Sequence, residues 1–301
     1  MATCNLNWQD ASWSLYRYEP SAAGAAIFAV LFGITFIIHA LQLYMTRTWY
    51  LLALVIGCIC MRECIGYIGR ILSSQEDPGC WTLGPYIIQS LLILIAPTFM
   101  AASIYMILGR IVELTDGESH TLIRRRWLTK VFVTGDVISL LFQSSGGGLM
   151  AVGGSSMEIG ENLIIVGLFV QLAFFGAFVI LAGVFHYRMN KTPTFQASLP
   201  QVRWQHYLVT LYVVGVIIWV RSLFRVIEYL QGNDGTLSRS EVYLYIFDAA
   251  LVLIAMLWMN WYHPSEIGVL LRGQEPKGNG LELVTGGFSR MGSRKQEAGY
   301  D

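Results

Sequence analysis

Charged side chains inside apolar stretches are the residues of this sequence that are best suited to chemistry. An ionisable residue costs about 2.5–3.5 kcal/mol at the centre of a membrane helix, so a chain that keeps several has a use for them. Arginine forks match phosphate, and carboxylates match a protonated amine. Five of these residues, together with Tyr67, form two triplets with spacings of four and three residues, which places each triplet on one helix face. The triplets are Glu63, Tyr67 and Arg70, and Arg221, Arg225 and Glu228.

The composition around these residues is that of a membrane protein. Hydrophobic residues make up 54% of the 301 residues and charged residues only 13%, whereas a soluble domain carries about 25% charged residues. The mean hydropathy is +0.52. The formal net charge of zero excludes a generally basic nucleic-acid binder, and the apolar content excludes a disordered chain. The sequence therefore predicts an all-α, polytopic integral membrane protein.

Seven stretches are long and apolar enough to be predicted as membrane-spanning helices. We expect an extracellular segment over residues 1–20, a seven-helix transmembrane bundle over 21–264 and a disordered cytosolic tail over 265–301. The predicted spans are residues 22–44, 49–72, 84–111, 127–152, 163–187, 207–230 and 242–262.

The distribution of Lys and Arg predicts the orientation. Basic residues gather in the first, third and fifth loops and in the tail, which all lie on one side of a seven-span chain. The other side carries only Arg17, Arg70 and Arg239. By the positive-inside rule, the N-terminus is outside and the C-terminus is in the cytosol. With this topology the two triplets lie in the outer half of the bundle, together with Gln89 and Asp248.

Two interpretations of this polar cluster are open. In the first, it is a structural ion-pair network, with Glu228 paired to Arg225 or Arg70 and Glu63 paired to an arginine. In the second, it is a cavity for an amphipathic molecule with a zwitterionic or amine head group. The predicted substrate-binding residues are Glu63, Tyr67, Arg70, Gln89, Gln143, Arg221, Arg225, Glu228 and Asp248.

Four other residues carry more local predictions. Asp136 in the fourth span is a candidate proton carrier, although a hydrogen-bonded structural role fits it equally well. Pro97 in the third span removes a backbone hydrogen bond and is a candidate hinge. Cys4 and Cys80 both fall on the predicted outer side, where a disulfide between them can form, with two free thiols as the alternative. The glycine-rich stretch around 146–154 is interpreted as an outer turn.

Motifs for metal or nucleotide chemistry are missing from the sequence. It contains no GxxxxGK[ST] loop, no HExxH and no GxSxG, and its five histidines are scattered. A metal hydrolase needs three or four converging ligands. We therefore expect no catalytic residues, no cofactor and no metal.

Several charged stretches resemble the fungal lipid-translocating exporter family, the proteins named for resistance to aminocholesterol. The similarity covers about residues 18–264 and is specific only when the motifs are taken together. The matching segments are YEPS at 18–21, RECIGYIGR at 62–70, AP at 96–97, SIYMILGR at 103–110, GDV at 135–137, QSSGGG at 143–148, RSLFRVIEY at 221–229, Asp248, and HP at 263–264.

This resemblance implies a fungal membrane protein, at the plasma membrane or an endomembrane, that moves or exports amphipathic molecules. Sphingoid bases, phospholipids and sterol-like toxicants are the implied substrates, with a contribution to drug resistance and membrane stress. The expected partners are lipids or lipophilic small molecules and not nucleic acid; the oligomeric state is not predicted. A seven-span receptor or sensor of lipid homeostasis is the main alternative, and a membrane-embedded metal hydrolase is a weaker one.

Overall fold

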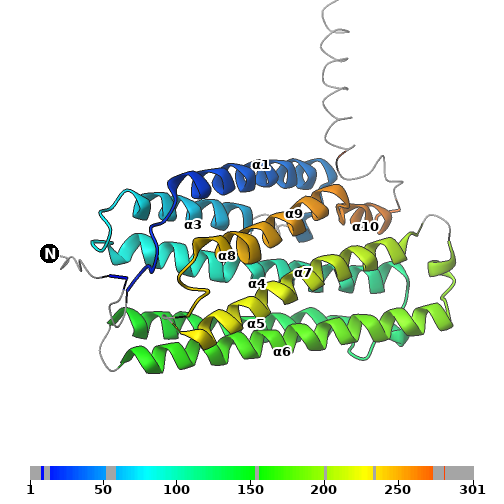
Figure 1. Cartoon of the computed structure of the whole chain (residues 1–301). Coiled ribbons are helices and arrows are strands. Elements are labelled where there is room, and N and C mark those ends of the chain that lie inside the picture. The colour runs from blue at the N-terminus through cyan, green and yellow to red at the C-terminus, as the bar shows by residue number, and fades with distance from the viewer. Residues whose placement is uncertain are drawn as a thin grey trace, which may run out of the picture.

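The structure is a bundle of long helices in which each helix packs against the next (Figure 1). It is a computed structural model that describes residues 8–9, 14–51, 59–152, 156–199, 202–232, 235–273 and 281. These residues form helices, turns and loops and no strand, as predicted. The helices are α1 (Ala22–Thr46), α3 (Ile59–Ser74), α4 (Leu83–Leu114), α5 (Arg125–Val152), α6 (Ser156–Lys191), α7 (Trp204–Gln231), α8 (Glu241–Leu244), the π-helical η4 (Tyr245–Ala250), α9 (Leu251–Trp261) and α10 (Ser265–Leu270), with short 3-10 turns at Trp49–Leu51, Glu118–His120 and Gln196–Ser198.

Apolar helices identify an integral membrane protein. Helices occur in all seven predicted ranges. Within the described residues, four helical stretches are long and apolar enough to cross a membrane, and they are Ala22–Thr46, Ser156–Lys191, Trp204–Gln231 and Glu241–Leu270. Seven crossings and the orientation of the chain stay predictions.

The helices close into a ring because α1 packs against both α3 and α9. Helix α4 packs against α3 and α5 and also contacts α7 and α10. Its residues Ile104, Tyr105 and Leu108 are buried, and the Tyr105 ring lies 4.5 Å from the Phe178 ring of α6. Side chains that face outward along the helices are often large and apolar, such as Ile34 and Ile180, which suits contact with lipid.

The two ends of α1 are tied to distant parts of the chain. Ser21 caps the first turn by accepting a hydrogen bond from the Gly24 amide. At the other end, Arg47 has a positive φ of 52°, which stops the helix. Arg272 then donates to the carbonyls of Thr46 and Arg47 at 2.7 and 3.0 Å. Helix α10 and the residues after it are thus held against the end of α1.

The glycine-rich stretch after Gln143 is helical, so its interpretation as a turn is wrong for the described residues. Helix α5 continues through Gly146 and Gly148 to Val152. A Cβ added at Gly146 would lie 2.5 Å from the carbonyl oxygen of Gly160 in α6. The glycine therefore allows two helix backbones to approach closely, which a turn would not require.

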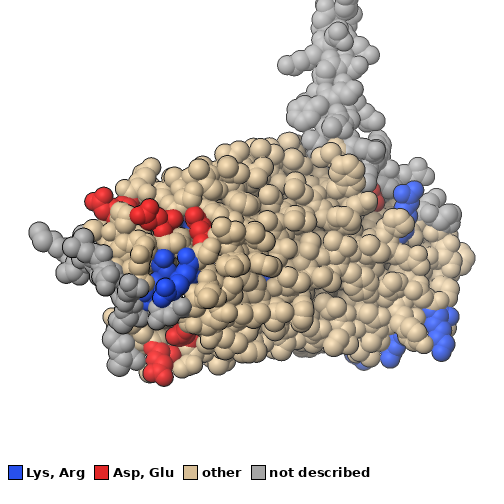
Figure 2. All heavy atoms as spheres, viewed as in Figure 1, with Lys and Arg blue, Asp and Glu red and all other residues tan. Residues whose placement is uncertain are grey.

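On the face drawn in Figure 2, exposed charge gathers at the two ends of the bundle. Figure 2 shows acidic and basic side chains near the end that holds the N-terminal segment, basic side chains near the opposite end, and an uncharged band between them. We call these the amino end and the carboxyl end. The predicted domain boundary after 264 falls just before α10, which buries Ile267 in the bundle. Structure therefore continues past that boundary to residue 273, and the rest of the predicted tail lies outside the described residues except for Leu281.

Candidate functional site

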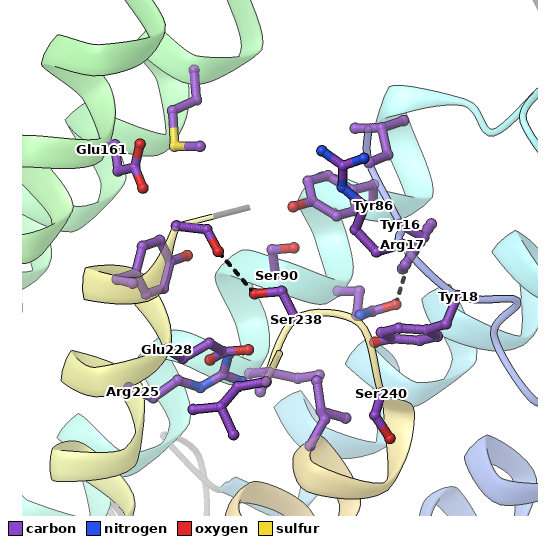
Figure 3. A pocket seen from close by; sticks show the side chains of 18 of the residues that line it. Tyr16, Arg17, Tyr18, Tyr86, Ser90, Glu161, Arg225, Glu228, Ser238 and Ser240 are labelled. Atoms are coloured by element: carbon purple, nitrogen blue, oxygen red, sulfur yellow. Dashed lines mark hydrogen bonds and ion pairs between the residues drawn. The ribbon is translucent and has the colours of Figure 1, made fainter. Parts of the chain in front are cut away.

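A polar cavity opens at the amino end of the bundle and has a volume of about 160 Å³ (Figure 3). Helices α4, α5, α6, α7 and α8, the loop before α8 and the N-terminal segment all contribute to its wall. The residues that line it are Leu15, Tyr16, Arg17, Tyr18, Tyr86, Gln89, Ser90, Ile93, Met150, Met157, Glu161, Arg225, Glu228, Tyr229, Gly232, Leu237, Ser238, Ser240 and Leu244.

The base of this cavity is an ion-pair network centred on Asp248. The carboxylate of Asp248 is buried and accepts from both Arg221 and Arg225 of α7. Arg225 also donates to Glu228 at 2.8 Å, so two arginines are matched by two carboxylates. Asp248 lies in the π-helical turn η4, and such turns are frequent at functional sites because they shift side chains out of α-helical register.

Arg221 also compensates for Pro97. In an α-helix, the amide of residue 97 would donate to the carbonyl of Ile93, but proline has no N–H. The guanidinium of Arg221 donates to that carbonyl at 2.8 Å instead. Helix α4 therefore continues through Pro97. The carbonyl of Ile93, which receives no hydrogen bond from Pro97, belongs through Arg221 to the same network as Asp248. The role of Pro97 as a hinge stays a proposal.

Arg70 is held by a second network beside the cavity. Its buried guanidinium pairs with Glu241 at 2.7 Å and donates to the hydroxyls of Tyr18 and Tyr245 at 2.9 and 3.3 Å. It also lies over the Tyr18 and Tyr245 rings. Of the two partners predicted for Glu228, the structure therefore pairs it with Arg225, whereas Arg70 pairs with Glu241. Glu241 was missed because it follows the sixth span in a loop sequence that gives no periodic signal.

Tyr67 lies next to Arg70 in space, as its spacing on α3 predicts. Its ring stacks with those of Phe28 and Phe32 at 5.8 Å each. Phe28 also stacks with Tyr245 at 5.2 Å. Tyr67 thus packs in an aromatic cluster behind the cavity wall and does not line the cavity itself.

Residues 15–18 of the N-terminal segment form part of the cavity wall. Tyr16 is buried against Trp81 and donates from its hydroxyl to Gln89 at 2.9 Å. Burial raises the pKa of the Tyr16 phenol above its usual range, so the donor proton is kept. Trp8 packs edge-on against Trp81, next to Cys80, which is disulfide-bonded. Cys4 lies outside the described residues, so the pairing of Cys4 with Cys80 stays a prediction.

Glu161 is a cavity residue that the sequence reasoning missed. It lies on α6 across the cavity from Arg17 and Tyr86 (Figure 3). Among the described residues it has no ion pair, unlike Glu228 on the neighbouring wall. Its carboxylate oxygen lies 3.3 Å from where a Cβ at Gly232 would stand. The signal in the sequence was a lone acidic residue near the start of a span, which by itself resembles an ordinary helix N-terminus.

Of the predicted substrate-binding residues, Gln89, Arg225 and Glu228 line the cavity, whereas the described side chains that do not line it are Tyr67, Arg70, Gln143, Arg221 and Asp248. Gln143 is buried between α5 and α6, where it donates to Ser139 and to Gln171 at 2.6 and 3.1 Å. Asp136 is buried on α5 beside the hydroxyl of Tyr105, and neither of its carboxylate oxygens has a hydrogen bond of standard geometry. Glu63 lies on α3, but its side chain is outside the described part of the structure.

Metal ligands do not converge in the part of the chain that the structure describes. No three His, Cys, Asp or Glu residues there lie close enough together to hold an ion. The available chemistry of the cavity is therefore that of fixed charges, phenols and hydroxyls. Such groups can orient a polar head group.

The fold and the cavity together define a helical membrane protein with a charged cavity at one end of its bundle. The chain belongs to the RTA1-like protein family, whose model matches residues 54–270. It is 36% identical to protoporphyrin uptake protein 1 of Saccharomyces cerevisiae over 287 residues, covering 84% of this chain and 92% of that protein. Protein RTA1 of the same yeast is 36% identical over 270 residues, covering 81% and 83%.

A relative with lower sequence identity is named as a transporter. The sphingoid long-chain base transporter RSB1 of a Saccharomyces cerevisiae strain is 28% identical over 270 residues, covering 78% of this chain and 69% of that protein. No solved structure matches the chain.

Proposed function

We propose that this protein moves amphipathic molecules across or out of a membrane and that the amino-end cavity binds their charged head groups. The observation that carries this proposal is the pairing of opposite charges around one enclosed space. Arg225 is matched by Glu228 and Asp248, whereas Glu161 on the facing wall has no ion pair among the described residues.

This asymmetry favours a ligand with a positively charged group. Glu161 is half-buried, and a protonated amine entering the cavity could pair with its carboxylate. The phenols of Tyr229 and, on the opposite wall, Tyr86 offer ring faces and hydroxyls to a ligand in the cavity. A phosphate, when present, would compete with Glu228 for Arg225. Among the proposed substrates, sphingoid bases carry an amine and phospholipids a phosphate, whereas sterol-like toxicants are included on the resemblance alone.

The names of the relatives agree with this proposal. One is a sphingoid long-chain base transporter and another a protoporphyrin uptake protein, so both handle amphipathic molecules. We extend to this chain the transport of such molecules, a place in the plasma membrane or an endomembrane of a fungus, and a contribution to drug resistance. Asp136 as a proton carrier, Pro97 as a hinge and Glu63 as a second head-group carboxylate belong to the same proposal.

The test is transport by the purified full chain in proteoliposomes. Release of a fluorescent sphingoid base and of a fluorescent phosphatidylcholine would be followed by access of an external quencher. We expect wild type to accelerate at least the cationic substrate over empty vesicles. Glu161→Gln keeps the shape but removes the charge, and it is expected to slow the sphingoid base more than the zwitterionic lipid.

Glu118→Gln is the matched control, because Glu118 is an exposed carboxylate in the turn after α4, away from the cavity. It should transport both substrates at the wild-type rate. Equal rates for wild type and Glu161→Gln with the cationic substrate would remove the proposed head-group role. Wild-type rates no higher than those of empty vesicles would remove the transport proposal itself.

A further inference from the structure

A groove with a volume of about 290 Å³ lies between α4 and α5 toward the carboxyl end of the bundle. The residues that line it are Met106, Gly109, Arg110, Glu113, Arg125 and Thr129. The four residues from α4 follow one face of that helix, and the two from α5 lie one turn apart at its start. The groove shares no lining residue with the amino-end cavity, so it is a separate site.

The charges in the wall of this groove do not cancel. Nη1 of Arg110 lies 2.9 Å from one carboxylate oxygen of Glu113, and Nη1 of Arg125 lies 2.6 Å from the other. Two guanidinium groups therefore share one carboxylate, which leaves the wall with a net positive charge. All three side chains are partly exposed, so an anion can reach them from outside the bundle.

The start of α5 adds more positive charge beside the groove. Arg124 precedes α5, and Arg126 and Lys130 lie on its first turns. All three are exposed, and within the described residues none of them forms an ion pair. Asp116 and Glu118, the remaining acids between residues 110 and 130, belong to the turn after α4 and do not line the groove. The surroundings therefore attract an anion toward the groove.

An apolar stripe continues from the groove along α4. It consists of Phe99, Ala102 and Met106, which follow each other at helical spacing and are each partly exposed. We call these three residues the α4 stripe. Gly109 leaves room beside it: outside its own helix backbone, a Cβ added at Gly109 would have only Oγ1 of Thr129 within 4 Å, at 3.8 Å. The groove thus joins charged groups to a surface that suits hydrocarbon.

Trp127 indicates the depth of the groove in the membrane. It lies in the same turn of α5 as Arg125 and is 60% exposed, and exposed Trp side chains near helix ends suit the membrane–water interface. Helix α4 ends at Leu114, one turn beyond Arg110. We therefore expect the charged part of the groove at the level of lipid head groups, with the α4 stripe running toward the bilayer centre.

We infer that this groove binds an anionic phospholipid, with its phosphate at Arg110 and Arg125 and an acyl chain along the α4 stripe. Guanidinium groups bind phosphate through paired, charge-assisted hydrogen bonds, and basic pockets between membrane helices accommodate anionic head groups. A zwitterionic lipid fits less well because its own cation would enter a positively charged site. Free phosphate fits less well because it has no chain to place on the stripe. Lipid binding at this end of the bundle does not depend on the proposed transport.

Lipid binding by the purified full chain tests the inference. The protein in detergent would be titrated with dioctanoyl phosphatidic acid, dioctanoyl phosphatidylcholine and glycerol 3-phosphate, and native mass spectrometry would count the bound molecules. We expect one molecule of phosphatidic acid to bind with saturation, at least about tenfold more tightly than phosphatidylcholine. Glycerol 3-phosphate should bind much more weakly than phosphatidic acid because it lacks the acyl chains.

Two substitutions should change this binding in opposite directions. Arg125→Gln removes one phosphate donor and should weaken the binding of phosphatidic acid by about tenfold. Glu113→Gln removes the carboxylate that competes with the phosphate, so binding should become tighter. Arg188→Gln is the matched control, because Arg188 is exposed in the last turn of α6 and does not line the groove. It should bind phosphatidic acid like wild type.

Gly109→Leu separates binding in the groove from general electrostatic attraction. The substitution keeps every charge, but its side chain should occupy the space beside Thr129 and weaken the binding of phosphatidic acid severalfold. Gly109→Ala adds only a methyl group at ordinary van der Waals distance and should bind nearly like wild type. Attraction to a basic surface without a groove predicts equal binding by wild type and both variants, and that result would contradict the inference.

Four further results would overturn the inference. They are equal binding of phosphatidic acid by wild type and Arg125→Gln, equal weakening by Arg188→Gln and Arg125→Gln, no preference for phosphatidic acid over phosphatidylcholine, and binding of glycerol 3-phosphate as tight as that of phosphatidic acid. Should Arg125→Gln or Gly109→Leu fail to fold, Glu113→Gln still decides, because it replaces a partly exposed carboxylate and unchanged or weaker binding would contradict the inference.

Discussion

Asp248 is the carboxylate that compensates the charge of both arginines at the base of the cavity. It is 1% exposed and neutralises two arginines that are themselves almost fully buried. A buried ion pair contributes little net stability when intact, because desolvation offsets the Coulomb attraction, but losing one partner leaves an uncompensated charge. The cavity therefore rests on a network in which the acidic member is the sensitive one.

Replacing Asp248 by Asn should destabilise the protein by about 3–5 kcal/mol, since Arg221 and Arg225 would lose their shared carboxylate. The measurement is thermal unfolding of the purified protein in detergent, followed by intrinsic fluorescence. A change as small as that of a surface ion pair would show that Asp248 does not hold both arginines.

Glu113→Gln is the matched control for that substitution. Glu113 pairs with Arg110 and Arg125 at the carboxyl end, where all three side chains are partly exposed, so its loss should cost about 0–1 kcal/mol. Burial tends to raise the pKa of Glu113, but hydrogen bonding and the charges of Arg125 and Arg110 lower it below its usual 4.5. Its contribution is therefore present above pH 4.5 and lost as the pH falls through the lowered pKa.

At the level of helices, the contact between α5 and α6 depends on glycine. Gly146 and Gly160 let the two backbones approach so closely that an added Cβ at either position would meet the other's carbonyl oxygen. Gly148, only two residues further along α5, has open space around it. The same residue type thus has opposite roles at neighbouring positions.

Gly146→Ala should destabilise the protein by about 1–3 kcal/mol because the new methyl group meets backbone that cannot move aside. Gly148→Ala should be neutral or stabilising by up to about 1 kcal/mol because alanine favours the helix. Denaturation curves of the two variants, measured side by side, give the comparison. Equal effects would mean that the close approach of α5 and α6 is absent.

The hydrogen bond from Arg221 to Ile93 makes α4 and α7 interdependent. Pro97→Ala restores an N–H that can bind the Ile93 carbonyl, so Arg221→Lys should cost less stability in that background than in wild type. We expect a coupling free energy of about 0.5–1.5 kcal/mol in the double-mutant cycle, measured by unfolding of all four proteins. If the stability changes of the two substitutions are strictly additive, Arg221 does not donate to the Ile93 carbonyl that Pro97 leaves without an amide donor.

Across the whole molecule, charge separates the two ends of the bundle. The cavity and its aromatic cover lie at one end, and Arg110, Arg125 and Arg272 lie at the other. By the positive-inside rule, we predict that the basic end faces the cytosol and that the cavity opens to the outside.

Cysteine labelling tests this orientation in intact cells. A membrane-impermeant maleimide should modify Ser238→Cys at the amino end directly, because the residue lines the open cavity. Ser119→Cys, in the turn after α4, should react only after the membrane is permeabilised. Unsubstituted protein gives the background from native cysteines. The reverse pattern of labelling would invert the topology.

Local patterns in the sequence determined the class of protein and much of the polar network. Apolar stretches predict membrane helices because hydrocarbon leaves no other way to satisfy the backbone. Helical spacing likewise places Arg221, Arg225 and Glu228 on one face, and the structure pairs the last two.

Only the tertiary structure decided which distant groups meet. Glu241 reaches Arg70, Arg221 reaches the carbonyl opposite Pro97, and His39 faces His263, each across more than 100 residues. Periodicity describes one helix at a time, whereas a cavity and its charges arise from how separate helices rotate and pack against each other.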